Sequence, residues 1–168
     1  ALYNPHLWKI DTSMIPTNDI GLYAFISSIG CYAKCSYCKL ADMFPKIQYR
    51  PIEAVVGEMV TINKAKGALH FTGDDDNFLM SPKRLAELDG AMSSKGLNQT
   101  LDFQARSTDV LRAKPYLDKD RTISVTMGIE SFVPSQLLRW KKCITVEQNV
   151  EAIELLRELE IGMKINII

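Results

Sequence analysis

The sequence lacks an excess of charge of either sign. Its 168 residues carry 20 Lys and Arg against 20 Asp and Glu, so the formal net charge is zero. This balance gives no evidence for binding to nucleic acid or to an anionic membrane. Glycine and proline are also scarce, at 9 and 7 residues, which excludes collagen-like and low-complexity chains. Because 46% of the residues are hydrophobic, we exclude intrinsic disorder and expect a folded domain.

Long hydrophobic runs are missing as well. No stretch approaches the ~18 consecutive apolar residues of a membrane span, and the longest runs, such as 21–26, have the length of a strand. The N-terminus has no basic region followed by an apolar core, so it does not resemble a signal peptide. We therefore expect a cytoplasmic protein without a membrane partner.

Both ends of the sequence lack the features expected of a complete protein. The first residue is Ala1 rather than Met, and residues 161–168 have the pattern of a buried strand that stops in mid-run. We interpret the chain as an excised fragment, with 1–19 as an N-terminal extension or linker and 20–168 as the first part of a core domain. The open edge of a last strand favours association, so we expect the isolated chain to be poorly soluble or oligomeric.

Strand and helix patterns alternate along the chain. Strands are expected at 20–27, 68–72, 99–105, 122–129 and 161–168, and helices at 51–66, 81–96, 107–117 and 145–159. Residues typical of helix ends support these limits; they are Pro51, Gly67, Ser81, Gly96, Ser107 and the capping-box pair Thr145 and Gln148. Such alternation indicates an α/β fold of βαβ units with a parallel sheet and right-handed crossovers.

Five strands are too few for a closed eight-stranded barrel, which takes roughly 250 residues. The sheet is therefore expected to be either an open half-barrel or a doubly wound sheet cut short. In both architectures the functional residues gather in loops at the C-terminal ends of the strands. These loops are expected at 28–38, 73–80, 104–107 and 130–132.

Three of the four cysteines lie within eight residues, as Cys31-Tyr-Ala-Lys-Cys35-Ser-Tyr-Cys38. One loop can thus place three thiolates around a [4Fe–4S] cluster, which is held by such ligands. Three protein ligands leave one iron open, like the open position of a catalytic metal. Structural zinc normally takes four protein ligands, and His70 or Cys143 would supply the fourth only through a coincidence of the fold. The crowding favours a cluster in a reducing compartment over disulfides.

This loop, placed after the first expected strand, resembles that of the radical S-adenosylmethionine (radical SAM) superfamily. The resemblance covers about residues 20–168 and implies a partial (β/α) TIM-like barrel of the radical SAM type, truncated after the fifth strand. It implies that Cys31, Cys35 and Cys38 ligate the [4Fe–4S] cluster and that S-adenosylmethionine binds the open iron. In the family, reductive cleavage of S-adenosylmethionine yields methionine and a 5′-deoxyadenosyl radical. The implied partners are a reductant, such as a flavodoxin or ferredoxin, and an unidentified substrate.

The same resemblance assigns cofactor contacts to the first two loops. Tyr37 occupies the aromatic position that packs near the adenine, with ordinary packing as the alternative. Gly73, Asp74 and Asp75 stand where the superfamily often has Gly-Gly-Glu, which contacts the ammonium group of the cofactor. A carboxylate and backbone carbonyls suit an ammonium cation. A solvated loop or a divalent-cation site is the alternative for this acidic run.

Residues after the third and fourth expected strands complete the assigned contacts. The resemblance places Arg106 at the cofactor carboxylate, because a guanidinium group binds carboxylates well. It places Glu130 and Ser131 at the ribose hydroxyls or the methionyl part. A salt bridge between Arg106 and Glu130 is the alternative explanation for this pair.

Two short patterns resemble the cobalamin-dependent branch of the superfamily. They are Asp-Asp-Asn-Phe at 75–78 and Gly-Ile-Glu-Ser at 128–131. Enzymes of that branch usually carry a separate N-terminal cobalamin domain, so cobalamin would act through a domain that is not in this chain. Cys143 is interpreted as a packing or turn residue, and neither His6 nor His70 is assigned any chemistry.

The sequence therefore predicts a radical SAM enzyme core. It would bind the cluster and S-adenosylmethionine and use the 5′-deoxyadenosyl radical to modify a substrate, with methylation by a transferase as one such reaction. The alternatives are a non-catalytic iron–sulfur or zinc-binding module, and a radical enzyme without cobalamin that modifies RNA or a peptide. The sequence assigns no catalytic residue.

Overall fold

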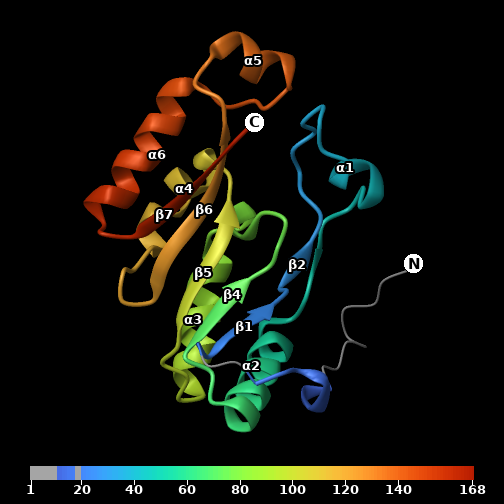
Figure 1. Ribbon diagram of the computed structural model, residues 1–168, viewed down its shortest axis with the longest axis vertical. Helices are drawn as coiled ribbons and strands as arrows, with labels where there is room; N and C mark the ends of the chain where they lie inside the picture. Colours follow the sequence, from blue (N-terminus) through green and yellow to red (C-terminus); the bar gives the residue numbers. More distant parts are fainter. Residues whose placement is uncertain (1–10, 18–19) are drawn as a thin grey trace.

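The computed structural model describes residues 11–17 and 20–168. Five parallel strands form one sheet in the order β1-β4-β5-β6-β7 (Figure 1). Their bounds are Leu22–Phe25, His70–Gly73, Thr100–Ala105, Thr122–Glu130 and Gly162–Ile167. Each of these strands thus joins the sheet beside the one before it. The α/β fold with a parallel sheet is confirmed.

Four helices connect the successive strands of this sheet. They are α2 (Ile52–Lys66), α3 (Lys83–Ser94), α4 (Ser107–Ala113) and α6 (Val146–Glu158). With the strands in sequential order, right-handed crossovers place all of these helices on one face, whereas a doubly wound sheet reverses its order and carries helices on both. Of the two expected architectures, the structure is therefore the open half-barrel (Figure 1).

The hydrophobic core lies between the sheet and these helices. Alternate residues of a strand point to opposite faces of the sheet. In β6, the side chains of Val125, Met127 and Ile129 are fully buried, whereas Thr126 and Gly128 are only partly buried. Burying one large apolar side chain such as these stabilises the folded state by roughly 1.5–3 kcal/mol. The apolar side chains thus hold this face of the sheet against the helices. The opposite face of the sheet is left for polar residues.

Two of the expected helix ends are confirmed in detail. Thr145 and Gln148 form the capping box, in which the backbone N–H of each residue donates to the side-chain oxygen of the other, at 3.0 and 3.2 Å. Gly67 ends α2 in the left-handed conformation, with φ 65°. Glycine tolerates this conformation because it has no Cβ.

The expected starts of three helices are wrong. Pro51 precedes α2 instead of lying in its first turn. Neither Ser81 nor Ser107 caps a helix, because α3 begins after Pro82 and Ser107 already lies within α4. The Ser107 hydroxyl instead donates to Asn149 Oδ1 of α6 at 2.6 Å, so a tertiary contact has replaced the local cap.

Several short elements were not expected from the sequence. The two-residue strands β2 (Ser28–Ile29) and β3 (Gln48–Tyr49) pair antiparallel and bracket the segment that carries the three cysteines. This segment also contains α1 (Leu40–Met43), and α5 (Pro134–Arg139) follows β6. Single turns of 3-10 helix occur at Thr12–Met14, Phe78–Met80 and Lys114–Tyr116.

The last strand differs from its expected burial. Residues 161–168 were expected to form a buried strand, but most of β7 is exposed and only Ile161, just before it, is fully buried. The expectation was wrong because β7 is the end strand of the sheet and pairs only with β6 among the described strands. His6 and most of the segment 1–19 lie outside the described residues. In the described part of the chain, no helix has the length and hydropathy required to cross a membrane.

Candidate functional site

Cys31, Cys35 and Cys38 line one cavity of about 160 Å³. Cys35 is buried, and the other two are partly exposed. The opposite wall comes from β5, β6 and β7, which contribute Gln104, Thr126 and Asn166. The cavity thus lies where the loop after β1 meets the polar face of the sheet near the C-terminal strand ends. This is the expected location of a functional site in such a fold.

Hydrogen bonds hold the cysteine loop on several sides. The Gly30 N–H donates to Asp76 Oδ2 at 2.8 Å, and the Ser36 N–H donates to the carbonyl of Trp140 at 2.8 Å. Between them, the Tyr32 hydroxyl contacts both carboxylate oxygens of Asp109 at 2.9 and 3.0 Å. The loop is therefore fastened to three separate parts of the fold.

Arg106 places a buried cation against this loop. Its Nη1 donates to Cys35 Sγ at 3.4 Å, and its Nη2 donates to the carbonyl of Lys142. Burial opposes its charge, but the hydrogen bond to Cys35 and the nearby ionisable groups leave the pKa of Arg106 above its ordinary value. Burial also raises the pKa of the Cys31 thiol, and the charge of Arg106 counteracts this effect. A fixed cation favours thiolates, the form that binds metals.

A buried ion pair forms another part of the cavity wall. Lys142 Nζ lies 3.1 Å from Glu130 Oε1 and donates to the Tyr37 hydroxyl at 3.2 Å. Glu130 adopts a left-handed conformation, with φ 66°, which is uncommon for residues other than glycine. The alternative salt bridge between Arg106 and Glu130 was wrong, because the ion-pair partner of Glu130 in the described residues is Lys142.

Tyr37 both packs locally and faces the cavity. Its ring makes an edge-to-face contact with Trp140 at a centroid distance of 5.9 Å, and the residue also lines the cavity. Burial, followed by the charges of Cys35 and Glu130, raises the pKa of Tyr37 far above its ordinary value. Tyr37 is therefore a neutral group beside the thiols, and its expected contact with an adenine stays a prediction.

The three carboxylates of the acidic run after β4 have different surroundings. Asp75 is fully buried and accepts from the Ser27 N–H at 2.6 Å and from the hydroxyls of Ser27 and Ser28 at 2.7 and 2.6 Å. Asp74 and Asp76 are both exposed, but of the two only Asp76 lines the cavity. Asp75 thus supports the end of β1, and Asp76 is the carboxylate of this run that is placed to meet a ligand.

Gly73 and Ser131 are both placed for packing or local structure. A Cβ at Gly73 would meet the rings of Phe25 and Phe78 and the Cβ of Phe103 at 3.2–3.3 Å, so a side chain there would force these neighbours to shift. The Ser131 hydroxyl donates to Gln136 Oε1 at 2.7 Å and accepts from the Val133 N–H at 3.0 Å. These bonds anchor the start of α5. The cofactor contacts expected of both residues stay predictions.

His70 and Cys143 do not line the cavity of the three cysteines. His70 begins β4, at the other end of the strand from the cavity, and its Nδ1 lies 2.7 Å from Thr100 Oγ1. Cys143 is exposed in a left-handed conformation, with φ 54°. That geometry agrees with its interpretation as a turn residue.

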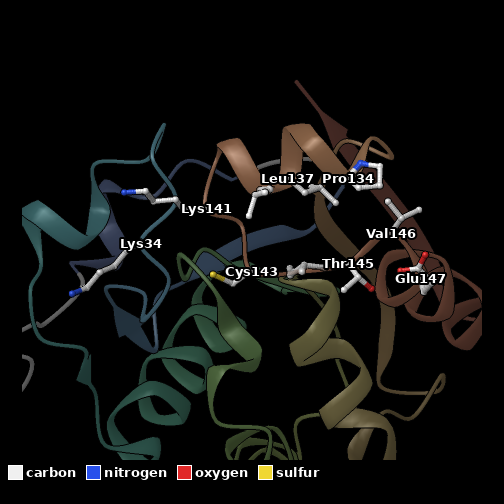
Figure 2. Close-up of a pocket in the computed structure, with 10 residues that line it drawn as sticks. Lys34, Pro134, Leu137, Lys141, Cys143, Thr145, Val146 and Glu147 are labelled. Atoms are coloured by element: carbon white, nitrogen blue, oxygen red, sulfur yellow. The ribbon is translucent and has the colours of Figure 1, made fainter.

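Cys143 lines a second, larger pocket of about 690 Å³. Its walls are mainly apolar and come from α5, the start of α6 and the turn between them. Figure 2 shows Lys34 and Lys141 on one side of this pocket and Val146 and Glu147 on the other. Lys34 belongs to the cysteine loop, so this loop borders both pockets.

The model of the Radical SAM superfamily matches residues 25–168. The chain belongs to this superfamily. Its cysteine loop, the strands β4 to β7 of the parallel sheet and the four connecting helices lie within the matched range, which begins at the last residue of β1.

Two curated relatives share part of their length with this chain. Both are named anaerobic magnesium-protoporphyrin IX monomethyl ester cyclase. The protein of Cereibacter sphaeroides is 29% identical over 137 residues, which cover 79% of this chain and 22% of the relative. That of Rubrivivax gelatinosus is 27% identical over 132 residues, covering 77% and 24%. The chain therefore spans less than a quarter of the length of these two relatives.

Solved structures show the same fold. The cobalamin-dependent S-adenosylmethionine radical enzyme OxsB with aqua-cobalamin bound superposes with a TM-score of 0.72 at 21% identity, covering 86% of this chain and 23% of that one. The radical S-adenosylmethionine methyltransferase TsrM from Kitasatospora setae, solved with tryptophan and an S-adenosylmethionine analogue, gives 0.73 at 23% identity, covering 87% and 30%. At these identities the similarity shows the fold of this chain and no more.

The donor set of the cavity fits an iron–sulfur cluster. Three thiols share one cavity, and a buried guanidinium contacts one of them. No three His, Cys, Asp or Glu side chains among the described residues converge as they would around a single metal ion. In a cluster each thiolate binds a different iron, so its cysteines surround a larger volume than the ligands of one ion do.

Sequence reasoning missed several residues that shape this site. Lys142 and Asp76 line the cavity, and Asp109 and Asn77 hold the residues around it. Asp76 and Asn77 both lie in the Asp-Asp-Asn-Phe motif at 75–78, but the sequence assigns a contact to neither and assigns one to Asp75 instead. If buried and outward positions are taken to alternate strictly after β4, Asp75 is assigned to a buried position and Asp76 to an outward one.

Proposed function

We propose that this chain binds a [4Fe–4S] cluster through Cys31, Cys35 and Cys38 and binds S-adenosylmethionine in the same cavity. The protein would then cleave S-adenosylmethionine reductively and direct the resulting radical to an unidentified substrate, with methylation as one outcome. The observation that carries the proposal is the single cavity shared by all three thiols and Arg106. Membership of the superfamily supports it.

The residues of the cavity suggest how the ligands would be held. When bound and reduced, the cluster supplies the electron that breaks the bond between sulfur and C5′, which leaves methionine and a 5′-deoxyadenosyl radical. Arg106 offers a fixed cation for the carboxylate of the methionyl part. Asp76 offers a carboxylate for its ammonium group, in place of Asp75. The electron would come from a flavodoxin or ferredoxin in the cytoplasm.

We also propose that cobalamin acts with this chain through another domain. The support is the resemblance of the two short motifs to the cobalamin-dependent branch and the cobalamin named for OxsB. We assign no described residue to cobalamin. Adding hydroxocobalamin to the 168-residue chain should therefore leave the cobalamin absorption spectrum unchanged, whereas a spectral shift would contradict this part of the proposal.

The test is anaerobic reconstitution with iron and sulfide, followed by reduction in the presence of S-adenosylmethionine. The unchanged chain should bind about four irons and four sulfides and release 5′-deoxyadenosine. Cys35→Ala should abolish the charge-transfer absorption and the cleavage. Cys143→Ala is the matched control, because this exposed cysteine lies in the other pocket, and it should retain both.

Metal analysis distinguishes the alternatives. One zinc per chain without labile sulfide would contradict the proposal and favour a non-catalytic zinc module. Four irons without any cleavage of S-adenosylmethionine would favour a non-catalytic iron–sulfur module. Normal iron content in Cys35→Ala would also overturn the assignment of ligands.

A further inference from the structure

A carboxylate outside the cavity connects the segments that form it. Asp109, in the first turn of α4, is fully buried. It accepts from the Tyr32 hydroxyl at 2.9 Å, from Asn77 Nδ2 at 2.7 Å and from Arg112 Nη1 at 2.8 Å. A buried carboxylate is costly unless it is paired and hydrogen-bonded. Tyr32 belongs to the cysteine loop and Asn77 to the loop after β4, so their bonds tie both loops to α4, the helix that also carries Arg112.

Two of the donors lead directly to the thiols. Tyr32 follows Cys31 in the chain, and the guanidinium of Arg106 lies over the Tyr32 ring at 5.6 Å while it donates to Cys35. Asn77 in turn accepts from the Arg106 N–H at 3.3 Å through its Oδ1. The contacts therefore form a closed circuit through the cysteine loop, the loop after β4 and the start of α4.

We propose that Asp109 is a positioning residue that holds the cysteine loop in the conformation that presents Cys31 and Cys35 to a cluster. Asp109 itself does not line the cavity, so it acts through Tyr32 and through Asn77. The role in cluster binding rests on the proposed function. The role in holding the loop does not, because it concerns the metal-free chain.

The metal-free chain offers a direct measurement of loop opening. Cys35 is only 7% exposed, so an alkylating reagent reaches it when the loop opens locally. Tyr32→Phe removes the hydroxyl and keeps the ring beneath Arg106. We expect alkylation of Cys35 to accelerate about fivefold in this variant, the effect of one lost hydrogen bond on an opening equilibrium. Asp109→Asn should give at least the same acceleration. Mass spectrometry of the modified peptides measures both rates.

Two controls separate this role from a general loss of stability. The exposed Cys143 should react at the same rate in all variants. Gln99→Ala removes hydrogen bonds to Asn63 and to the Ala68 carbonyl, which involve neither Asp109 nor the cysteine loop, so it should leave Cys35 protected. An unchanged Cys35 rate in Tyr32→Phe, or an equal rise in Gln99→Ala, would overturn the proposal. Should Asp109→Asn fail to fold, Tyr32→Phe still decides the question.

The reconstituted chain gives a second, spectroscopic reading. The visible absorption of the cluster should decay about fivefold faster in Tyr32→Phe than in the unchanged chain when a chelator is added. An unchanged decay rate would contradict the role of Asp109 in cluster binding. If the unchanged chain takes up no iron and sulfide, the proposed function fails, whereas the alkylation experiment still decides whether Asp109 holds the loop.

Discussion

The two pockets beside the cysteine loop differ in volume and in the polarity of their walls. The larger, of about 690 Å³, is mainly apolar, whereas the smaller, of about 160 Å³, contains three thiols, a guanidinium and a buried ion pair. The adjacent residues Lys141 and Lys142 illustrate this contrast. Lys141 is exposed at the larger pocket, whereas Lys142 is only 3% exposed in the smaller one. Volume therefore does not locate the chemistry of this fold; the ends of the strands do.

The largest expected effect comes from exchanging one lysine in each pocket. Lys142→Met should lower the free energy of unfolding by about 3–5 kcal/mol, because it leaves Glu130 buried without its ion-pair partner. Lys141→Met should change it by about 0.5 kcal/mol or less, as is usual for an exposed side chain. Urea denaturation followed by circular dichroism measures both variants.

A double variant shows whether the pair itself is responsible. Glu130→Gln combined with Lys142→Met removes both charges and should recover part of the lost stability. Equal losses in Lys141→Met and Lys142→Met would erase the contrast between the two pockets.

The second prediction separates the carboxylate that supports the smaller pocket from the one that lines it. Burial outweighs the hydrogen bonds from Ser27 and Ser28 and raises the pKa of Asp75. The folded chain thus holds this proton more tightly than the unfolded chain. The corresponding stability is complete at low pH and is lost as the pH rises from about 4 through the raised pKa of the folded state. Asp75→Asn should remove this decline, and Asp76→Asn should leave it unchanged.

Truncation at the same position tests the hydrogen bonds. Asp75→Ala leaves the Ser27 N–H and two hydroxyls without their acceptor, so it should lower the free energy of unfolding by about 2–3 kcal/mol. Thermal denaturation between about pH 4 and pH 7 gives the pH profiles of all three variants. Identical profiles for the unchanged chain and Asp75→Asn would show that Asp75 does not titrate in this range.

Local sequence signals predicted the larger elements of the fold and failed at the smaller ones. Strands such as 99–105 and the helix at 145–159 carry enough apolar residues to reveal their period. The two-stranded sheet of Ser28–Ile29 with Gln48–Tyr49 has two residues in each strand, too few for any period. Exposure of β7 also escaped prediction, because its composition is that of an interior strand and only its place at the end of the sheet decides burial.

For the site, spacing located the thiols but not the groups that hold them. The C-x3-C-x2-C pattern is local and therefore readable. Lys142 and Asp109 become part of the site only through burial, since Lys142 looks like an exposed residue beside Lys141 and Asp109 like an ordinary polar residue in a first helical turn. Their partners lie 12 and 77 positions away, at Glu130 and Tyr32, and no local pattern encodes such pairs.

The smallest expected effect concerns the space that the buried ion pair occupies. A Cβ at Gly128 would lie 2.6 Å from Glu130 Oε1 and 3.1 Å from Lys142 Nζ. Both atoms end flexible side chains, so Gly128→Ala should displace them and lower the free energy of unfolding by about 1 kcal/mol. Gly57→Ala is the matched control, because a Cβ there meets no atom within 4 Å on α2, and alanine should stabilise the helix by about 0.5–1 kcal/mol. If the ion pair is the cause, Gly128→Ala should cost less when Lys142→Met is already present. If Gly128→Ala lowers the free energy of unfolding equally with and without Lys142→Met, the strain lies in the backbone of β6 and not in the ion pair.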